Sequence, residues 1–104
     1  MIADVRTYTI VPRRMNEYVS LFETYGLPVA QWHGLTLAGY FISQIGALNQ
    51  VVHIWTYDSL ADFEAKRARR DGDPDWGAYL ARTAGMVTAQ EDKIMKPAAF
   101  SPIR

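Results

Sequence analysis

The chain has no cysteine among its 104 residues, and only two of those residues are histidines. The absence of cysteine excludes a disulfide framework, thiolate zinc sites, iron–sulfur ligation and a cysteine nucleophile, and it fits a reducing compartment. His33 and His53 stand at no spacing typical of a metal site, and no HExxH motif is present. We therefore expect no bound metal, and no sequence feature calls for haem or another cofactor.

The chain also has no excess of either charge and no long apolar run. Eleven basic and eleven acidic side chains cancel, so no net field attracts nucleic acid or an anionic membrane. No window approaches the roughly 18 apolar residues of a membrane span, and the first residues lack the pattern of a secretory signal. These features predict a soluble cytoplasmic protein.

Several functional motifs are missing as well. The sequence contains no G-x-G-x-x-G, no P-loop and no G-x-S-x-G elbow. A basic run at residues 66–70 is followed at once by aspartates at positions 71, 73 and 75. Because the local charges cancel, this run is interpreted as a solvated helix face rather than a nucleic-acid patch.

The remaining composition is that of a globular domain, with 49% hydrophobic and 12% aromatic residues. The length predicts one domain spanning residues 1–104. Four segments have β-strand composition: residues 2–10, 37–46, 49–57 and 86–95. The last is polar enough for a sheet edge, and the short link at 46–49 predicts a hairpin between the second and third strands. Gly39 is a candidate bulge.

Helical patterns fill the gaps between these strands. Apolar residues at helical spacing predict an amphipathic helix from residue 13 to 25. Pro28 predicts a kink or break, after which the apolar stripe resumes over residues 29–32 and stops at Gly34. The last nine residues are expected to form an extended arm.

Two further helices have clear start signals. Ser59 and Asp62 form a capping-box pattern for a helix reaching about Arg70. Asp73 as N-cap and Pro74 at the first position predict the next helix.

The order of elements is β-α-β-β-α-(α)-β, which is the split βαβ, ferredoxin-like arrangement of the α+β class. It predicts a four-stranded antiparallel sheet with helices on one face, and the first and third strands in the centre.

The third strand is predicted to be buried on both faces, because its apolar residues do not alternate with polar ones. We expect residues 52, 54 and 56 to face the helices. Val51, His53, Trp55 and Tyr57 would then lie on the open side of the sheet, beside the strand that carries Arg6 and Tyr8. An exposed apolar face of that size predicts a homodimer in which two sheets pack together.

These segments resemble a known family. The run Val5-Arg6-Thr7-Tyr8, the stretch 45–55, the segment 57–60 and the motif Phe100-Ser101-Pro102 are similar to those of NIPSNAP-domain proteins. The resemblance covers nearly the whole chain, and it implies the dimeric α+β barrel fold. It brings no established catalytic residues and no agreed reaction. Related barrels include cofactor-free monooxygenases, isomerases and decarboxylases, and haem-binding enzymes, and they hold small molecules between sheet and helices.

Two hypotheses about function follow. In the first, a homodimer binds a small aromatic or apolar organic molecule and transforms it without a tightly held cofactor. His53 would be the acid/base or polar anchor, and Arg6 would stabilise an anion or enolate. The walls of the site would come from Tyr8, Tyr25, Trp32, His33 and Trp55.

The second hypothesis is a non-enzymatic binding or scaffold dimer, in which the same residues only join two sheets. His33 would then be a helix cap that interacts with the negative end of the helix dipole. If His53 and Arg6 line a cavity, the first hypothesis is favoured. If they are sealed in a dimer interface, the second is favoured.

Overall fold

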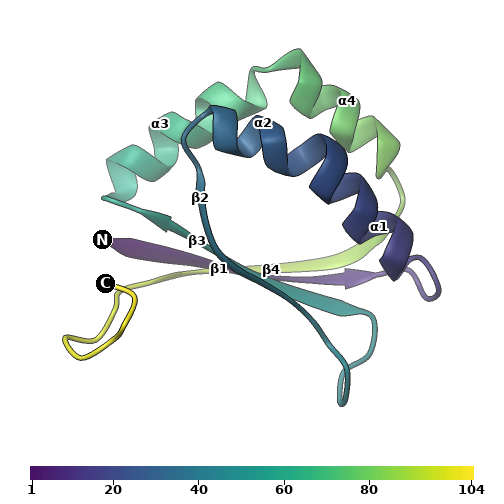
Figure 1. Cartoon of the computed structure of the whole chain (residues 1–104), viewed down its shortest axis with the longest axis horizontal. Coiled ribbons are helices and arrows are strands. Elements are labelled where there is room, and N and C mark those ends of the chain that lie inside the picture. The colour runs from purple at the N-terminus through teal and green to yellow at the C-terminus, as the bar shows by residue number, and fades with distance from the viewer.

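The computed structural model describes residues 1–104, which form four strands and a set of helices. Its elements are β1 (Ile2–Ile10), α1 (Met15–Leu21), a π-helical turn (Phe22–Gly26), α2 (Leu27–Trp32), β2 (Thr36–Ile42), β3 (Gln50–Tyr57), α3 (Leu60–Asp71), α4 (Pro74–Arg82) and β4 (Val87–Met95). All neighbouring strands are antiparallel, in the order β2-β3-β1-β4. The helices cover one face of the sheet and leave the other open (Figure 1). The predicted fold class and the central positions of β1 and β3 are confirmed.

The starts of α3 and α4 follow their capping residues. The Ser59 side chain accepts a hydrogen bond from the backbone N–H of Asp62 at 3.1 Å. The Asp73 carboxylate accepts one from the backbone N–H of Asp75 at 2.9 Å, and Pro74 occupies the first turn of α4. Both interactions satisfy backbone donors that a helix N-terminus leaves free.

The first helical region continues past Pro28 through a π-helical turn, so the predicted kink or break is replaced by a wider turn. The backbone N–H of Leu27 donates to the carbonyl of Phe22, five residues earlier. Pro28 then lies in the first turn of α2, where a missing N–H costs little. The extra residue in the turn rotates Gly26 toward the core, where an added Cβ would lie 2.9 Å from the Phe22 ring. Only glycine allows that approach.

The hairpin between β2 and β3 differs from the prediction in one respect. The register of the two strands shifts between Leu37 and Gly39, which confirms an irregularity at the glycine. However, β2 ends at Ile42 rather than at residue 46, and residues 43–49 form a loop that extends beyond the sheet (Figure 1). This loop needs left-handed backbone at Gly46 (φ 106°) and Asn49 (φ 64°), which a continuing strand could not provide.

The predicted faces of β3 are reversed in the structure. The residues of β3 alternate between buried and half-buried, and the buried set is Val51, His53, Trp55 and Tyr57. These side chains lie under the helices, whereas Val52, Ile54 and Thr56 belong to the open face. The large rings fill the wide space between sheet and helices, which the smaller β-branched side chains could not fill. The prediction that the aromatic set and His53 face a partner subunit is therefore wrong.

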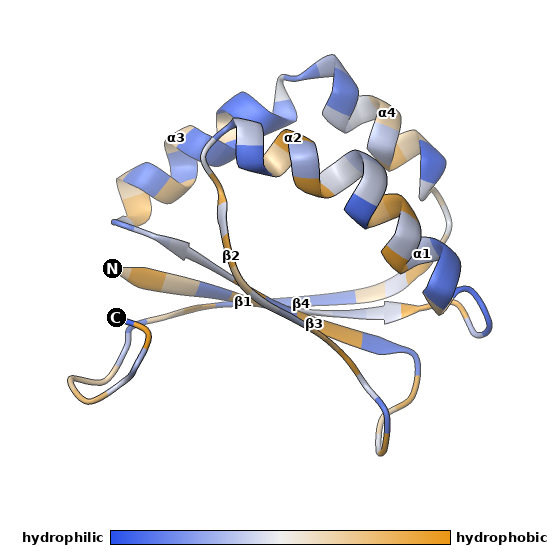
Figure 2. Ribbon diagram, viewed as in Figure 1, coloured by the Kyte–Doolittle hydropathy of each residue, from blue (hydrophilic) through white to orange (hydrophobic).

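The core between sheet and helices has two parts. One is built around Trp55, Tyr57, Phe22 and Tyr79, and the other around Ile10, Val51, Tyr18 and Met86. Apolar residues of the helices turn toward the sheet, and their outer surfaces are mostly hydrophilic (Figure 2). None of the helices has the length and apolar character that crossing a membrane would require.

The residues after β4 do not form the simple extended arm that we expected. They turn back at residues 98–101, where the backbone N–H of Ser101 donates to the carbonyl of Ala98 at 3.0 Å. The chain then ends close to its own N-terminus, at one end of the sheet (Figure 1). Pro102 and Ile103 line a shallow depression there with Met1 and Thr36.

Candidate functional site

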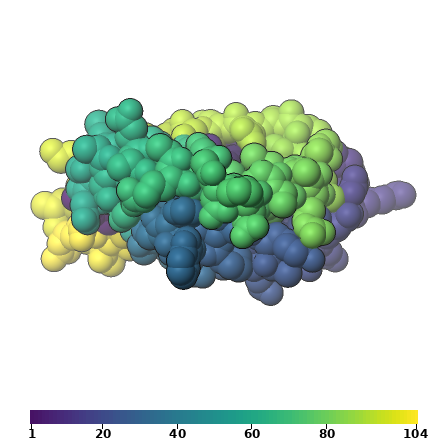
Figure 3. All heavy atoms as spheres, turned by 90° about the horizontal axis from the view of Figure 1, so that it is seen from above, coloured from purple at the N-terminus to yellow at the C-terminus, as the bar shows by residue number.

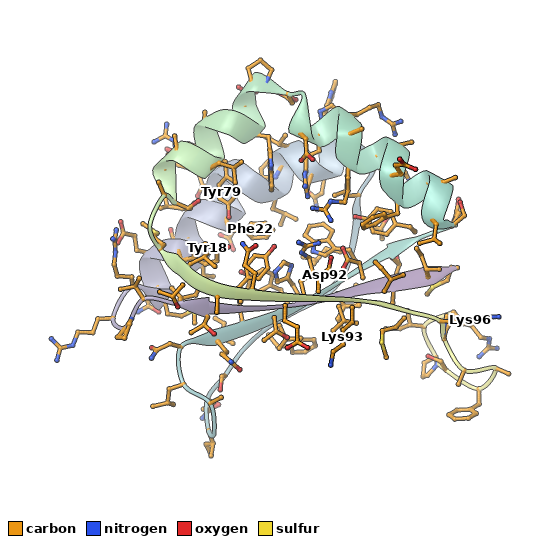
Figure 4. All side chains as sticks on the ribbon, turned by 180° about the vertical axis from the view of Figure 1, so that it is seen from behind. Tyr18, Phe22, Tyr79, Asp92, Lys93 and Lys96 are labelled. Atoms are coloured by element: carbon orange, nitrogen blue, oxygen red, sulfur yellow. The ribbon has the colours of Figure 1, made fainter.

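A cavity of about 110 Å³ lies between the sheet and the helices, and both halves of the chain contribute to it. Its lining residues are Asp4, Arg6, Tyr8, Tyr18, Phe22, Tyr40, His53, Trp55, Tyr57, Arg67, Arg70, Trp76, Tyr79, Leu80, Thr83, Val87 and Gln90. In Figure 4, Tyr18, Phe22 and Tyr79 point from the helices toward the sheet. Asp92 lies on the side of β4 that faces the helices. Seen from above, atoms of β1 are visible in a gap between α3–α4 and β4 (Figure 3).

His53 lies on the central strand β3 and is only 5% exposed. Its Nδ1 accepts a hydrogen bond from the indole Nε1–H of Trp55 at 2.7 Å. Because an indole nitrogen can only donate, this contact places the histidine proton on Nε2. Burial, together with the charge of Arg6, lowers the pKa of His53 to about 4, so the ring is neutral near pH 7. The ring therefore presents an Nε2–H donor to the cavity, and that donor has no protein partner.

Arg6 and Asp4 alternate with Thr7 and Val5 along β1, so both project toward the helices. The Arg6 Nη1 donates to Asp4 Oδ2 at 3.1 Å and to Asp92 Oδ2 at 2.9 Å, and its Nε donates to the Tyr8 hydroxyl at 2.9 Å. Burial works against the charged guanidinium, but Tyr8 and Asp4 outweigh it and raise the pKa of Arg6. Arg6 is thus a fixed positive charge in the wall of the cavity.

Asp4 is the only acidic residue in the cavity wall, and it is 1% exposed. Burial raises the pKa of Asp4 to about 6, with a further contribution from the neighbouring Asp92 carboxyl, while Arg6 acts in the opposite direction. One carboxylate oxygen, Oδ2, is held by Arg6 and lies 3.9 Å from the guanidinium of Arg67. The other, Oδ1, is buried and has no partner.

Tyr40 on β2 completes the polar side of the cavity. Its ring stacks on His53 with a centroid distance of 5.0 Å, because the two residues are paired across the β2–β3 ladder. Burial raises the pKa of Tyr40, so its hydroxyl keeps its proton and remains a donor. This hydroxyl is the third buried polar atom without a partner, after His53 Nε2 and Asp4 Oδ1. Buried polar atoms are nearly always hydrogen-bonded, so three such atoms on residues that line one cavity require a functional explanation.

The structure brings together four of the seven residues that the sequence singled out. Arg6, Tyr8, His53 and Trp55 all line the cavity. They do so from inside the subunit and not from an interface between two sheets.

The other three predicted site residues lie outside the cavity, which corrects the expectation that they form part of its walls. Trp32 is 83% exposed at the end of α2. Tyr25 is 40% exposed, because the π-helical turn rotates it outward, where it lies against the guanidinium of Arg82. His33 Nε2 pairs with Asp73 Oδ2 at 2.8 Å and so connects the end of α2 to the start of α4.

Sequence reasoning missed Asp4, Tyr40 and the arginines of α3. Asp4, Arg6 and Tyr8 occupy alternate positions of β1 and so share one face of the sheet. This two-residue period was the signal that could have placed Asp4 in the site. Arg67 and Arg70 belong to the basic run that was interpreted as a solvated face. In the structure Arg70 is 12% exposed at its side chain, lies over the Trp76 ring and pairs with Asp71. No group of three or more histidine, aspartate or glutamate side chains is arranged to hold a metal ion.

The fold is shared by a class of small α+β proteins with known structures. A protein of Bacteroides thetaiotaomicron, named for antibiotic biosynthesis monooxygenases, superposes with a TM-score of 0.71 at 17% identity, covering 99% of this chain and 92% of that one. At this identity the likeness is one of fold alone.

The sequence assigns the chain more narrowly. The NIPSNAP family model matches residues 3–102, so this protein belongs to the NIPSNAP family, and the predicted family is confirmed. A crystal structure of an Agrobacterium tumefaciens NIPSNAP family protein of unknown function is 38% identical, with a TM-score of 0.95 and coverage of 100% and 94% of the two chains. A NIPSNAP domain protein of Burkholderia xenovorans is 32% identical, with a TM-score of 0.93 and coverage of 98% and 99%.

The animal relatives are longer proteins. The NipSnap protein of Drosophila melanogaster is 31% identical over 101 residues, which are 97% of this chain but 36% of that protein. In a Caenorhabditis elegans relative the matched region is 19% of the protein. The chain thus spans little more than a third of the fly protein and about a fifth of the worm protein.

Proposed function

We propose that the cavity between the sheet and the helices binds a small polar organic molecule. The observation that carries this proposal is the set of three buried polar atoms without partners: His53 Nε2, Tyr40 Oη and Asp4 Oδ1. Two are donors and one is an acceptor, so they complement a ligand that offers both kinds of group. A hydrogen-bonding ligand would remove the cost of leaving them unpaired.

The size of the cavity limits the ligand. An engineered cavity of about 150 Å³ is known to hold benzene, and this one measures about 110 Å³. The ligand would therefore have at most about six non-hydrogen atoms, unless the gap between α4 and β4 widens. This is smaller, and more polar, than the aromatic or apolar molecule expected from the sequence.

Binding is tested by titrating a panel of small hydroxy, keto and carboxylic compounds and measuring dissociation constants by NMR. For a compound that binds, Tyr40→Phe should weaken binding about tenfold, since it removes one hydrogen bond worth about 1.4 kcal/mol. Tyr25→Phe is the matched control, because it removes a tyrosine hydroxyl outside the cavity, and it should leave affinity unchanged. Equal effects of the two changes would argue against the proposal, as would a panel without any ligand.

The rival hypothesis, a scaffold without a ligand, has less support. It required His53 and Arg6 to be closed off between two subunits, whereas both line the cavity inside one subunit. Among reactions that need no tightly held cofactor, isomerisation suits these groups better than oxygenation, since the cavity offers a proton acceptor and hydrogen-bond donors. A cytoplasmic location stays a prediction.

We also propose a homodimer, now through a different set of residues. The open face carries Val5, Val52 and Ile54 at its centre and the exposed Phe41 on β2. Apolar residues in one patch on a sheet commonly mark a protein interface. A chain of this length with an uncovered sheet face is suited to an isologous dimer, in which the same patch on each of two subunits packs against the other.

The dimer is tested by measuring solution mass. The protein should sediment as two chains at about 20 µM, since a pair with a Kd of about 1 µM is mostly associated at that concentration. Ile54→Asp should shift it toward one chain, because a carboxylate in the interface loses its hydration. Ala78→Asp on the outer surface of α4 is the control and should keep the dimer. A wild-type mass of one chain would contradict the proposal.

A further inference from the structure

We propose that Asp4 is the proton acceptor of this cavity, and that the ligand is a small carbonyl compound with a hydrogen on the carbon beside its carbonyl group. This inference rests on the proposed binding function and adds a substrate class and a reaction to it. The three unpartnered atoms divide into one acceptor and two donors, which is the division that enolisation needs. The acceptor takes the proton, and the donors hold the oxygen that becomes negative.

The geometry of Asp4 suits a base that must be held still. Its Oδ2 is fixed by Arg6 at 3.1 Å, and Arg6 is itself held by Tyr8 and Asp92. The side chain is almost fully enclosed, yet Oδ1 has no partner within the protein. One oxygen therefore orients the carboxylate, and the other is left to receive a proton.

The environment of Asp4 also tunes its basicity. Burial raises the pKa of Asp4 to about 6, which makes it a stronger base than a surface aspartate while leaving it ionised at pH 7.5. The charged groups facing it are Arg6 on β1, Asp92 on β4 and Arg67 on α3. His53 on β3 is uncharged at this pH.

The two donors are placed to stabilise an enolate oxygen. His53 and Tyr40 are partners across the β2–β3 ladder, and their rings stack at 5.0 Å. The Trp55 indole keeps the His53 proton on Nε2, and the low pKa keeps the ring neutral, so Nε2–H can donate a hydrogen bond but cannot accept a proton. His53 is then an oxyanion donor, and the role of base passes to Asp4.

The reaction balances without any other reactant. The C–H bond beside the carbonyl breaks, and its proton moves to Asp4 Oδ1. The electron pair forms a C=C bond, and the carbonyl π pair moves onto oxygen, where His53 Nε2–H and the Tyr40 hydroxyl stabilise the charge. Asp4 then returns this proton, or one that has exchanged with solvent, to the same carbon or to another carbon of the enolate system. Arg6, Arg67 and Arg70 in the wall favour the negative intermediate.

The step is tested by solvent deuterium exchange at pD 7.5, followed by proton NMR with pyruvate, hydroxyacetone and cyclopentanone as probes. The protein should speed exchange of the hydrogens beside the carbonyl of at least one probe about 100-fold over buffer, in the range of general base catalysis. Asp4→Asn should abolish the acceleration, and Tyr40→Phe should reduce it about tenfold. Asp58→Asn changes an exposed aspartate outside the cavity and should have no effect.

A measurement on the wild-type protein guards against failure of the Asp4 variant to fold. The exchange rate, corrected for the reaction in buffer, should rise with pH and level off above the pKa of about 6 for Asp4. A probe that binds without faster exchange would overturn the role of Asp4 and leave the binding proposal standing. If no probe binds or exchanges, both fail. Equal acceleration by the wild type and Asp4→Asn, or a rate independent of pH, would also overturn the role of Asp4.

Discussion

Replacing Arg6 by methionine should lower the free energy of unfolding by about 3 kcal/mol at pH 7.5. Methionine keeps much of the packing of the side chain but removes the charge that Asp4 and Asp92 share. Removing one partner of a buried ion pair costs about 3–5 kcal/mol, because the remaining charge stays buried without compensation. We expect the lower end of that range, since Arg67 remains 3.9 Å from Asp4. Urea denaturation measures the change.

A double variant shows whether the loss comes from the ion pair. Arg6→Met combined with Asp4→Asn should be more stable than Arg6→Met alone, because the unpaired carboxylate is gone. The interaction free energy from the double-mutant cycle should be about 2 kcal/mol, within the range found for contacting residues. If the two changes simply add, Arg6 does not stabilise the fold through Asp4, and the electrostatic description of the cavity is wrong.

The stability of the Asp4→Asn and His53→Gln variants should change with pH in opposite directions between about pH 4 and 6. The pKa of Asp4 is raised from 3.8 to about 6 by burial and Asp92, so within this interval the folded chain binds more protons than the unfolded chain. Asp4 therefore makes stability fall as pH rises. The pKa of His53 is lowered from 6.5 to about 4, so the unfolded chain binds more protons and stability rises with pH.

Each of these contributions is on the order of 3 kcal/mol, at 1.36 kcal/mol per pKa unit. In the wild type they nearly cancel. In Asp4→Asn only the rise of stability with pH due to His53 remains. In His53→Gln only the fall of stability with pH due to Asp4 remains. The difference between the free energies of unfolding of the two variants should thus change by roughly 6 kcal/mol from pH 4 to 6.5. Surface carboxylates titrate alike in both variants and do not contribute to this difference. Asp58→Asn, which changes an exposed aspartate outside the cavity, is the control. Parallel profiles for the two cavity variants would contradict the assigned environments.

The fold could be predicted from the sequence because its signals are local. The alternation in β1, the β-branched and aromatic composition of β3, the caps at Ser59 and Asp73, and the turn residues before β3 each act within a few residues. These features determined the element order, and the crossover rules then placed β1 and β3 in the centre. The end of β2 was predicted four residues too late, because Ile45 looks like a strand residue yet lies in a loop.

The candidate site was harder to predict, because its position depends on tertiary packing, which local sequence patterns do not show. The two-residue period of a strand shows which residues of β3 share a face, and His53 was correctly placed beside the strand that carries Arg6. It does not show which face meets the helices. We assumed that polar and aromatic residues would face outward, but here a charged cluster lies inside because it lines a cavity.

Helix phase and strand register account for the remaining misses. Tyr25 fits the apolar stripe of an ordinary α-helix, and only the π-helical turn before α2 rotates it outward. Tyr40 becomes the neighbour of His53 only after the register shift at Gly39, which no periodicity reveals.

The state of the His53 ring is the most direct measure of the central claim, that this cavity offers unpaired polar groups to a small ligand. A nitrogen-15 NMR spectrum of the ring at pH 7 should show a neutral imidazole with its proton on Nε2, and binding of a probe should shift that Nε2–H signal. A protonated ring, a proton on Nδ1, or a signal that no probe shifts would contradict the claim.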